Sequence, residues 1–190
     1  MTTIVTVLTE GFADWETTLL NAVAHGYYGL DVAYATPDGK PVKSAGGMRV
    51  AADLAVEDIE LDKVDAVVFC GGTAWQSPGA PDIAKLAKAA VKKGKVVAGI
   101  CDGTMALAKA GLLDDVAHTS NGAGYLDGTG YKGQSRYRDV PYAVADGCIV
   151  TAPGTAPVRF MEAVMQALGK ADGNLDYYVG LHAAQYKAAA

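Results

Sequence analysis

The sequence predicts an α/β fold with a mostly parallel central sheet covered by helices on both faces. Strand and helix signals alternate along the chain, and the strand signals are short, continuously apolar runs such as residues 64–70 and 95–100. Runs of this kind are typical of strands that are buried on both faces, as in parallel sheets. With 190 residues and no linker, the chain is expected to form a single domain over residues 1–190.

The first half of the chain divides into elements by its apolar pattern. Strands are expected at residues 4–8, 30–35, 64–70 and 95–100, and helices at 14–25, 80–93 and 103–110. In the first helix, Trp15, Leu19, Ala22 and Val23 recur at helical spacing and are predicted to form its buried face.

Turn residues separate these elements. Pro37-Asp38-Gly39 predicts a turn because Pro fixes φ and Gly accepts a positive φ. Residues 42–52 are expected to form a short hairpin around Gly46-Gly47.

The second half of the chain is less regular. Residues 121–142 are rich in Gly and Tyr and show no clear period, so they are interpreted as an excursion with short strands over one edge of the sheet. A strand at 148–152 and helices at 157–168 and 174–187 complete the chain, which ends in an alanine tail at 188–190.

Cys101 is the strongest candidate for chemistry. It stands where the apolar run 95–100 meets the helical run 103–110, the strand–turn–helix arrangement called a nucleophile elbow. Free backbone N–H groups and the positive end of the helix dipole favour an anion there, so the thiol pKa is expected to fall. The alternative is a small buried hydrophobic residue, as most free cysteines are.

Composition and charge exclude several classes of partner. The net charge is −5 and the isoelectric point is about 5.1, which disfavours nucleic acid and anionic membranes. The lysines of residues 85–95 are spaced as a solvated helix face. We therefore expect a small-molecule substrate, with no nucleic acid and no membrane as partner.

The cysteines and the N-terminal residues indicate whether the protein binds a metal and in which cell compartment it lies. The three cysteines are odd in number and match no zinc spacing, so neither a metal nor another cofactor is expected. The first residues lead directly into a strand without signal-peptide architecture, and no run is long enough to span a bilayer. A reducing cytoplasm is the expected location.

Four motifs in a fixed order carry a resemblance to a known family. They are Trp15-Glu16-Thr17, residues 70–73 (Cys-Gly-Gly-Thr), residues 98–103 (Ala-Gly-Ile-Cys-Asp-Gly) with 110–113, and residues 146–152 with Gly154. Together they resemble the ThiJ/PfpI superfamily of the class I glutamine amidotransferase-like fold over about residues 4–168. Its relatives include the parkinsonism-associated deglycase and intracellular protease- and amidase-type proteins.

The resemblance implies a fold, an assembly and a set of site residues. The fold would be a flavodoxin-like three-layer αβα sandwich, usually in a homodimer. The resemblance makes Cys101 the nucleophile and Glu16 a nearby acid that can hold a proton. It assigns an oxyanion hole to backbone N–H groups near Gly72 and Asp102.

Elementary electrostatics agrees with the Glu16 assignment. A carboxyl group and a thiolate in contact share negative charge unfavourably, so one of them should hold a proton. A protonated Glu16 could donate a hydrogen bond to the thiolate and then act as general acid or base. The alternative is an acid stabilised by a helix N-terminus; Asp14 is a weaker candidate, expected to be a cap. Asp102 is expected to cap the helix that begins at Gly103, and it would oppose thiolate formation if it faced the sulfur.

The chain departs from the family where relatives carry a histidine. The residue after the cysteine is Asp102, and Thr119-Ser120 is followed by Asn121. His118 is close in sequence, but strand alternation would direct it differently from Asn121. His118 and Asn121 are retained as possible auxiliary residues, with a structural role expected for His118. Without a histidine base, a Cys-His-Glu triad for amide hydrolysis is doubtful.

Three functional hypotheses follow. The first is a cysteine-dependent enzyme acting on a small electrophile, of glyoxalase, deglycase or hydratase type. The second is a non-catalytic stress-response redox sensor that works through oxidation of Cys101. The third is an amidase-, glutaminase- or protease-like hydrolase. A set of aromatic residues could line a small pocket or form a dimer face: Trp15, Trp75, Tyr125, Tyr131 and Tyr137.

Overall fold

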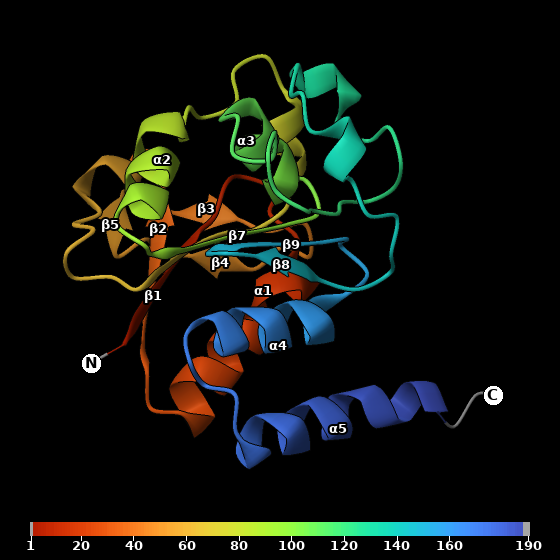
Figure 1. Ribbon diagram of the computed structural model, residues 1–190. Helices are drawn as coiled ribbons and strands as arrows, with labels where there is room; N and C mark the ends of the chain where they lie inside the picture. Colours follow the sequence, from red (N-terminus) through yellow and green to blue (C-terminus); the bar gives the residue numbers. More distant parts are fainter. Residues whose placement is uncertain (1, 188–190) are drawn as a thin grey trace.

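The computed structural model describes residues 2–187 and has three layers, with a twisted sheet between two layers of helices (Figure 1). The sheet has seven strands in the order β5-β2-β1-β6-β7-β9-β8, and every neighbouring pair is parallel except β8 and β9. The predicted flavodoxin-like α/β fold is confirmed. The strands are β1 (Thr3–Val7), β2 (Asp31–Thr36), β5 (Leu54–Ala55), β6 (Ala66–Phe69), β7 (Val96–Ile100), β8 (Val144–Asp146) and β9 (Ile149–Ala152).

Helices cover both faces of this sheet. One face carries α2 (Ala84–Lys92) and α3 (Gly103–Lys109), and the other carries α1 (Asp14–Ala22) and α4 (Pro157–Ala167) (Figure 1). The last helix, α5 (Gly173–Lys187), packs against α4 on the side away from the sheet. None of the described helices is long and apolar enough to cross a membrane. The alanine tail at 188–190 lies outside the described residues.

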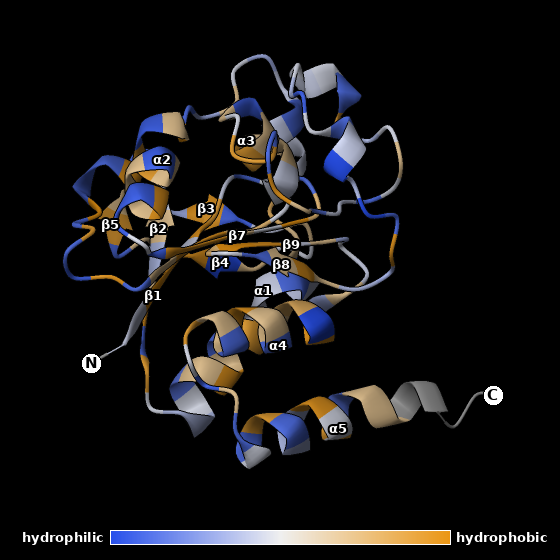
Figure 2. Ribbon diagram, viewed as in Figure 1, coloured by the Kyte–Doolittle hydropathy of each residue, from blue (hydrophilic) through white to orange (hydrophobic). Residues whose placement is uncertain are grey.

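The apolar strands contribute side chains to two hydrophobic cores, one on each face of the sheet. In β6, Val67 and Phe69 belong to the core beneath α2 and α3, whereas Ala66 and Val68 belong to the core beneath α1 and α4. Successive side chains of a strand point to opposite faces, so a continuous apolar run is required where both faces are covered. Figure 2 shows the apolar strands in the centre and hydrophilic residues on the outer helix surfaces.

The register of the central strands aligns their carboxyl ends. Val7 of β1 pairs with Phe69 of β6, which in turn pairs with Gly99 of β7. The segments that follow these strands therefore meet at one edge of the sheet, where ligands bind in open α/β sheets.

The buried face of α1 differs from the sequence prediction. Trp15 is 57% exposed and Ala22 is exposed, whereas Glu16, Thr17, Leu20 and Asn21 are buried. The prediction holds for Val23, which is buried, and for Leu19, which is partly buried against the core. It fails at Trp15 and Ala22 because the helix directs polar side chains inward. Beyond Ala22 the backbone widens into a π-helical turn, η1 (Val23–Tyr27).

The irregular segments agree with the predictions in part. The hairpin predicted around Gly46-Gly47 is present as β3 (Val42–Lys43) and β4 (Arg49–Val50), which form a separate antiparallel pair. The prediction of short strands within 121–142 is wrong. That segment has two 3₁₀ turns, η4 (Asp127–Thr129) and η5 (Gln134–Arg136), and a single bridge between His118 and Tyr137. The remaining short turns are η2 (Val56–Asp58) and η3 (Thr73–Gln76).

Candidate active site

Cys101 stands on the sharp turn between β7 and α3. Its φ is 54°, and it is the one non-glycine residue with positive φ among the described residues. This left-handed conformation costs a residue with a Cβ about 1–2 kcal/mol, so the surrounding packing must hold it. Gly103 helps to do so, because a Cβ there would collide with the backbone of Phe69 at the end of β6. The elbow is therefore pressed closely against the neighbouring strand, and the Cys101 side chain is half-buried.

Glu16 reaches the same point from the first turn of α1. It is fully buried, and its Oε2 accepts a hydrogen bond from the Gly71 N–H at 2.7 Å. Its Oε1 accepts no hydrogen bond from the described residues. A Cβ built on Gly154 would lie 2.9 Å from Cys101 Sγ and 3.0 Å from Glu16 Oε1, so the two side chains border one small space. The structure thus brings together the two residues that the sequence singled out.

Asn121 completes the surroundings of the sulfur. Its Nδ2 donates a hydrogen bond to Cys101 Sγ at 3.2 Å, and its Oδ1 accepts one from the Gly154 N–H at 2.9 Å. An amide has no ionisable proton, so Asn121 can orient and stabilise a thiolate but cannot act as a general base.

Burial sets the protonation of the pair. Removal from water raises the pKa of Glu16 to about 7, and the Asp102 carboxylate adds to this, against the opposing effects of the adjacent Cys101 thiol and the Gly71 N–H. Burial, followed by the charge of Glu16, raises the pKa of the Cys101 thiol to about 12. The expectation that this pKa falls was wrong, because desolvation and two carboxylates outweigh the end of a seven-residue helix. The resting thiol is neutral, and Glu16 is the group that titrates near neutral pH.

Asp102 does not have the predicted capping role. It occupies the N-cap position of α3 but makes no capping hydrogen bond. Its Oδ1 instead accepts hydrogen bonds from Gln76 Nε2, at 3.0 Å, and from the Tyr125 hydroxyl. The N–H groups of Gly72 and Asp102, assigned to an oxyanion hole, donate to no backbone carbonyl of the described residues.

His118 is held away from the sulfur. Its Nδ1 lies 2.9 Å from the Val116 carbonyl oxygen, and its ring is packed edge-on against Tyr131 and Tyr137. Burial lowers its pKa, which favours the neutral imidazole. No histidine of the described residues makes a hydrogen bond with Cys101. In this arrangement no imidazole is placed to accept the Cys101 thiol proton and pass it to a departing amine, as amidase chemistry requires.

The comparisons with known proteins decide the family. A sequence model described as the DJ-1/PfpI family matches residues 2–167, nearly the whole chain. The chain belongs to the DJ-1/PfpI family. The resemblance noted from four sequence motifs is thereby confirmed.

Solved structures of DJ-1/PfpI relatives superimpose closely. A DJ-1 superfamily protein from Agrobacterium tumefaciens is 39% identical with a TM-score of 0.93, covering 98% of this chain and 100% of that one. A thiJ/pfpI family protein from Bacillus anthracis is 30% identical with a TM-score of 0.87, covering 96% of this chain and 91% of that one.

Named DJ-1/PfpI relatives carry two different activity labels. The uncharacterized protease YoaZ of Bacillus subtilis is 33% identical over 129 residues, which are 67% of this chain and 61% of that relative. The chain thus spans less than two thirds of the length of YoaZ. The glutathione-independent glyoxalase DJR-1.2 of Caenorhabditis elegans is 32% identical over 132 residues, covering 67% of this chain and 68% of that protein.

Of the aromatic residues considered for a pocket, two lie at the DJ-1/PfpI site. Trp15 donates from Nε1 to the Gly154 carbonyl at 3.1 Å, and Tyr125 contacts Asp102. Trp75 is buried against Phe69, and Tyr131 and Tyr137 surround His118. Sequence reasoning missed Gln76, which stands on the turn after Gly72 and carries no pattern that marks it.

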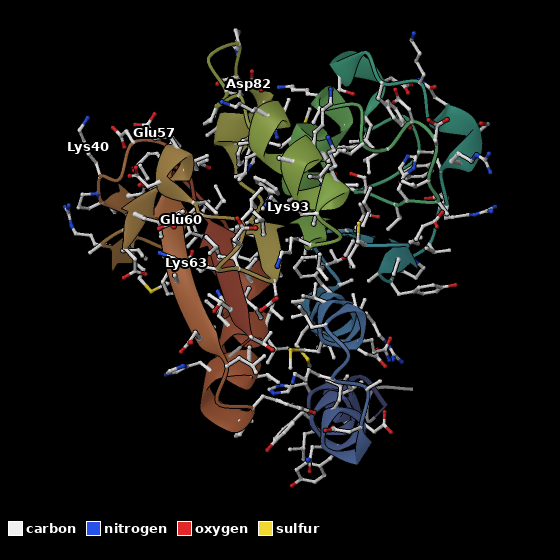
Figure 3. The ribbon with its side chains drawn as sticks, turned by 60° about the vertical axis from the view of Figure 1, so that its left-hand side comes forward. Lys40, Glu57, Glu60, Lys63, Asp82 and Lys93 are labelled. Atoms are coloured by element: carbon white, nitrogen blue, oxygen red, sulfur yellow. The ribbon has the colours of Figure 1, made fainter. Side chains whose placement is uncertain are left out.

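The other features of this DJ-1/PfpI chain lie apart from Cys101. A cavity of about 550 Å³ lies between η2 and α2, with Glu57 and Asp82 among its lining residues; both are labelled in Figure 3. No group of three or more His, Cys, Asp or Glu side chains among residues 2–187 could hold a metal ion.

Proposed function

We propose that this chain is a cysteine-dependent enzyme that acts on a small electrophilic carbonyl compound, in a glyoxalase-, deglycase- or hydratase-like reaction. Cys101 is the nucleophile and Glu16 is the acid and base. The observation that carries the proposal is that a neutral thiol on a left-handed turn lies beside a buried carboxyl group of pKa about 7, with no histidine of the described residues hydrogen-bonded to the sulfur. A base with a pKa near the working pH is suited to proton transfer.

Glu16 and Cys101 together account for addition to an aldehyde. The Glu16 carboxylate accepts the thiol proton while Cys101 Sγ forms a bond to the carbonyl carbon. The negative charge moves to the carbonyl oxygen, where the N–H groups of Gly72 and Asp102 stabilise it. Glu16 then returns the proton to that oxygen, which leaves a neutral hemithioacetal on Cys101.

For a 2-oxoaldehyde, the same carboxyl group can complete the reaction. The Glu16 carboxylate removes the proton from C1 of the hemithioacetal, which leaves an enediolate with its negative charge on the C2 oxygen. Glu16 returns this proton to C2, and the proton of the C1 hydroxyl passes to the C2 oxygen as the C1 carbonyl forms. The product is a thioester of Cys101, which one water molecule hydrolyses to a 2-hydroxy acid and the free thiol. The net change is the addition of one water molecule, so no external oxidant or reductant is needed.

Two considerations favour this chemistry over amide hydrolysis. Amide cleavage requires an acid that protonates the departing amine, which a triad histidine supplies; Asp102 and Asn121 stand at the two matching positions. A carbonyl addition has no amine to expel. The C. elegans relative that is named a glyoxalase supports the same choice. We therefore expect no appreciable glutaminase or protease activity.

The redox-sensor alternative is disfavoured by the state of the thiol. Oxidation by peroxide proceeds through the thiolate, and the raised pKa of Cys101 makes the thiolate scarce at neutral pH.

The assembly and location belong to the same proposal. We propose a single-domain protein that acts in the cytoplasm as a homodimer, in keeping with its family and with the frequency of two-fold oligomers. Sedimentation over a range of concentrations would show a dimer; a concentration-independent monomer would contradict this part.

The test of the activity is consumption of methylglyoxal. Purified protein should convert methylglyoxal to lactate without glutathione. Cys101→Ser should lower kcat/KM at least about a thousandfold, and Glu16→Gln about 10²–10⁴-fold. The control is Cys148→Ser, which alters a cysteine paired through its carbonyl with Val97 near the start of β7, whereas Cys101 follows the end of that strand. An inactive wild-type protein, or activity that survives in Cys101→Ser, would overturn the proposal.

A further inference from the structure

Asp102 holds a negative charge beside the nucleophile at a cost that its structural contacts do not explain. It opposes ionisation of its neighbours, because its charge raises the pKa of both Glu16 and Cys101. It also does not cap α3, the ordinary role of an acid at that position. A neutral residue would impose no such penalty on a thiolate.

The carboxylate is nevertheless fixed in place. The Asp102 side chain is only 5% exposed, and two neutral donors from different segments converge on its Oδ1. Gln76 approaches from η3 after β6, and Tyr125 approaches from the excursion 121–142. Neither donor neutralises the charge, and Oδ2 accepts no hydrogen bond from the described residues.

A chain of polar contacts links the Asp102 carboxylate to the reacting sulfur. Tyr125 contacts Asp102 through its hydroxyl, and the Asn121 amide acts on that same hydroxyl while donating to Cys101 Sγ. Asp102, Tyr125, Asn121 and Cys101 thus form one continuous wall. Among the ion pairs of the described residues, none includes Glu16 or Asp102, so no Lys or Arg is paired with the charge on this wall.

We infer that Asp102 is a specificity-determining residue that makes the site select uncharged electrophiles and reject anionic ones. The inference rests on the proposed role of Cys101 as nucleophile and names the substrate class of that site. An anion within a few ångströms of Sγ meets the Asp102 charge in a partly desolvated space, where like charges repel far more strongly than in water. We expect a discrimination of about tenfold at moderate ionic strength.

A pair of alkylating agents tests this selection without requiring turnover. Iodoacetamide and iodoacetate react with a thiol by the same displacement of iodide and differ mainly in charge. The rate ratio of iodoacetamide to iodoacetate is measured at Cys101 by peptide mapping and divided by the ratio for 2-mercaptoethanol. The normalised ratio should be about ten for the wild-type protein and should fall severalfold in Asp102→Asn, where the Glu16 carboxylate is the charge that remains beside Sγ. Glu57→Gln, which removes an exposed carboxylate distant from the site, should leave it unchanged.

The salt dependence of the normalised alkylation ratio tests the inference on the wild-type protein alone. Raising the salt concentration should reduce the normalised ratio, because counterions screen the Asp102 charge from the approaching anion. This measurement holds even if Asp102→Asn does not fold. A wild-type ratio equal to that of the free thiol would overturn the inference. A ratio that Asp102→Asn leaves unchanged would also overturn it. Asp102 would then have only the structural role of binding Gln76 and Tyr125.

A substrate pair separates this inference from the proposed activity. The ion 4,5-dioxopentanoate and its methyl ester carry the same 2-oxoaldehyde and differ by one negative charge. The wild-type protein should prefer the ester about tenfold in kcat/KM, and Asp102→Asn should lose most of this preference. If neither compound is converted while the alkylation ratio stands, the proposed activity fails and the charge selection survives. If both are converted equally, the charge selection fails and the activity survives.

Discussion

The carboxyl ends of β6 and β7 lie side by side, and each is followed by a cysteine. The two cysteines differ in burial, backbone conformation and hydrogen bonding. Cys70, after β6, is fully buried, and its thiol donates to the Ala13 carbonyl oxygen at 3.4 Å. Burial raises its pKa far above the ordinary value for a thiol. Cys101, after β7, is half-buried, stands at φ 54° and receives a hydrogen bond from Asn121.

The difference shows that a strand end does not by itself make a nucleophile. Both thiols are neighbours of Glu16: Cys70 Sγ lies 4.0 Å from Oε2, and the space beside Oε1 is bordered by Cys101 and Gly154. Oε2 accepts a hydrogen bond from the Gly71 N–H, whereas Oε1 accepts none from the part of the chain that the structure describes. The left-handed turn at residue 101 presents its thiol to the free side of the carboxyl group, and the extended chain at residue 70 keeps its thiol in the core.

The largest expected effect is on thiol reactivity at the two strand ends. Iodoacetamide should label Cys101 about a thousandfold faster than Cys70, because Cys70 must wait for local opening of the core. Time-resolved labelling with peptide mapping measures both rates on one sample, and Cys148 provides a half-buried reference. Faster labelling of Cys70 or Cys148 would remove Cys101 as the nucleophile.

The next effect concerns the carboxyl group between the two thiols. The pKa of Glu16 is raised from 4.5 to about 7 in the folded state, so the folded protein binds this proton more tightly than the unfolded chain does. Its stabilising effect is present below about pH 4.5 and is lost as the pH rises through about 7, a change of about 3 kcal/mol.

Urea denaturation at a series of pH values measures this change. The wild-type protein should lose about 3 kcal/mol over that range relative to Glu16→Gln, which has no titrating proton. The exposed Glu57→Gln variant should follow the wild-type curve. Parallel curves for wild type and Glu16→Gln would mean that Glu16 titrates as an ordinary exposed acid.

A smaller effect is expected from closing the gap between the strand ends. A Cβ on Gly71 would lie 2.7 Å from Cys101 Cβ and 2.9 Å from Glu16 Cδ, so Gly71→Ala forces the two side chains apart. We expect a loss of about 1–3 kcal/mol in the free energy of unfolding. Gly79→Ala, where a Cβ meets nothing within 4 Å, is the matched control. Equal stability of the two variants would show that the Cys101–Glu16 contact is loose.

The smallest effect is expected from Asn121→Ala. This variant removes the hydrogen bond to Cys101 Sγ, which lowers the thiol pKa. One such bond contributes about 0.5–1.5 kcal/mol, so alkylation of Cys101 should slow about threefold to tenfold and its pH dependence should move upward. Labelling of Cys70 should not change. An unaffected Cys101 rate would show that the bond does not stabilise the thiolate.

Most of the fold could be predicted from the sequence because parallel strands carry a strong local signal. The apolar runs at β1, β6 and β7 and the turn glycines mark the sheet and its order of elements. Helix α1 could not be oriented in the same way, since its inward face carries Glu16 and Asn21 and its exposed face carries Trp15. Hydrophobic periodicity reports the core, and it misleads where a helix lies over the site.

The sequence predicted which residues form the site better than it predicted their pKa values. The elbow motif indicated Cys101, and the family resemblance indicated Glu16, which the structure places beside it. The direction of the Cys101 pKa shift was missed because burial depends on contacts between distant segments. For the same reason the partners of Asp102 were not foreseen, because Gln76 and Tyr125 are 26 and 23 residues away from it in the chain.

The glycines around the sulfur have a consequence for how this protein could be redesigned. At Gly71, Gly103 and Gly154 an added Cβ would strike the elbow, Glu16 or the neighbouring backbone. On that side the site is walled by main chain and offers no position for a new side chain. Another part of the surroundings consists of side chains from irregular segments, such as those of Gln76 and Tyr125, which contact Asp102. Directed evolution of substrate range should therefore accumulate its productive changes on one side of the site, and libraries restricted to the loop positions should lose little.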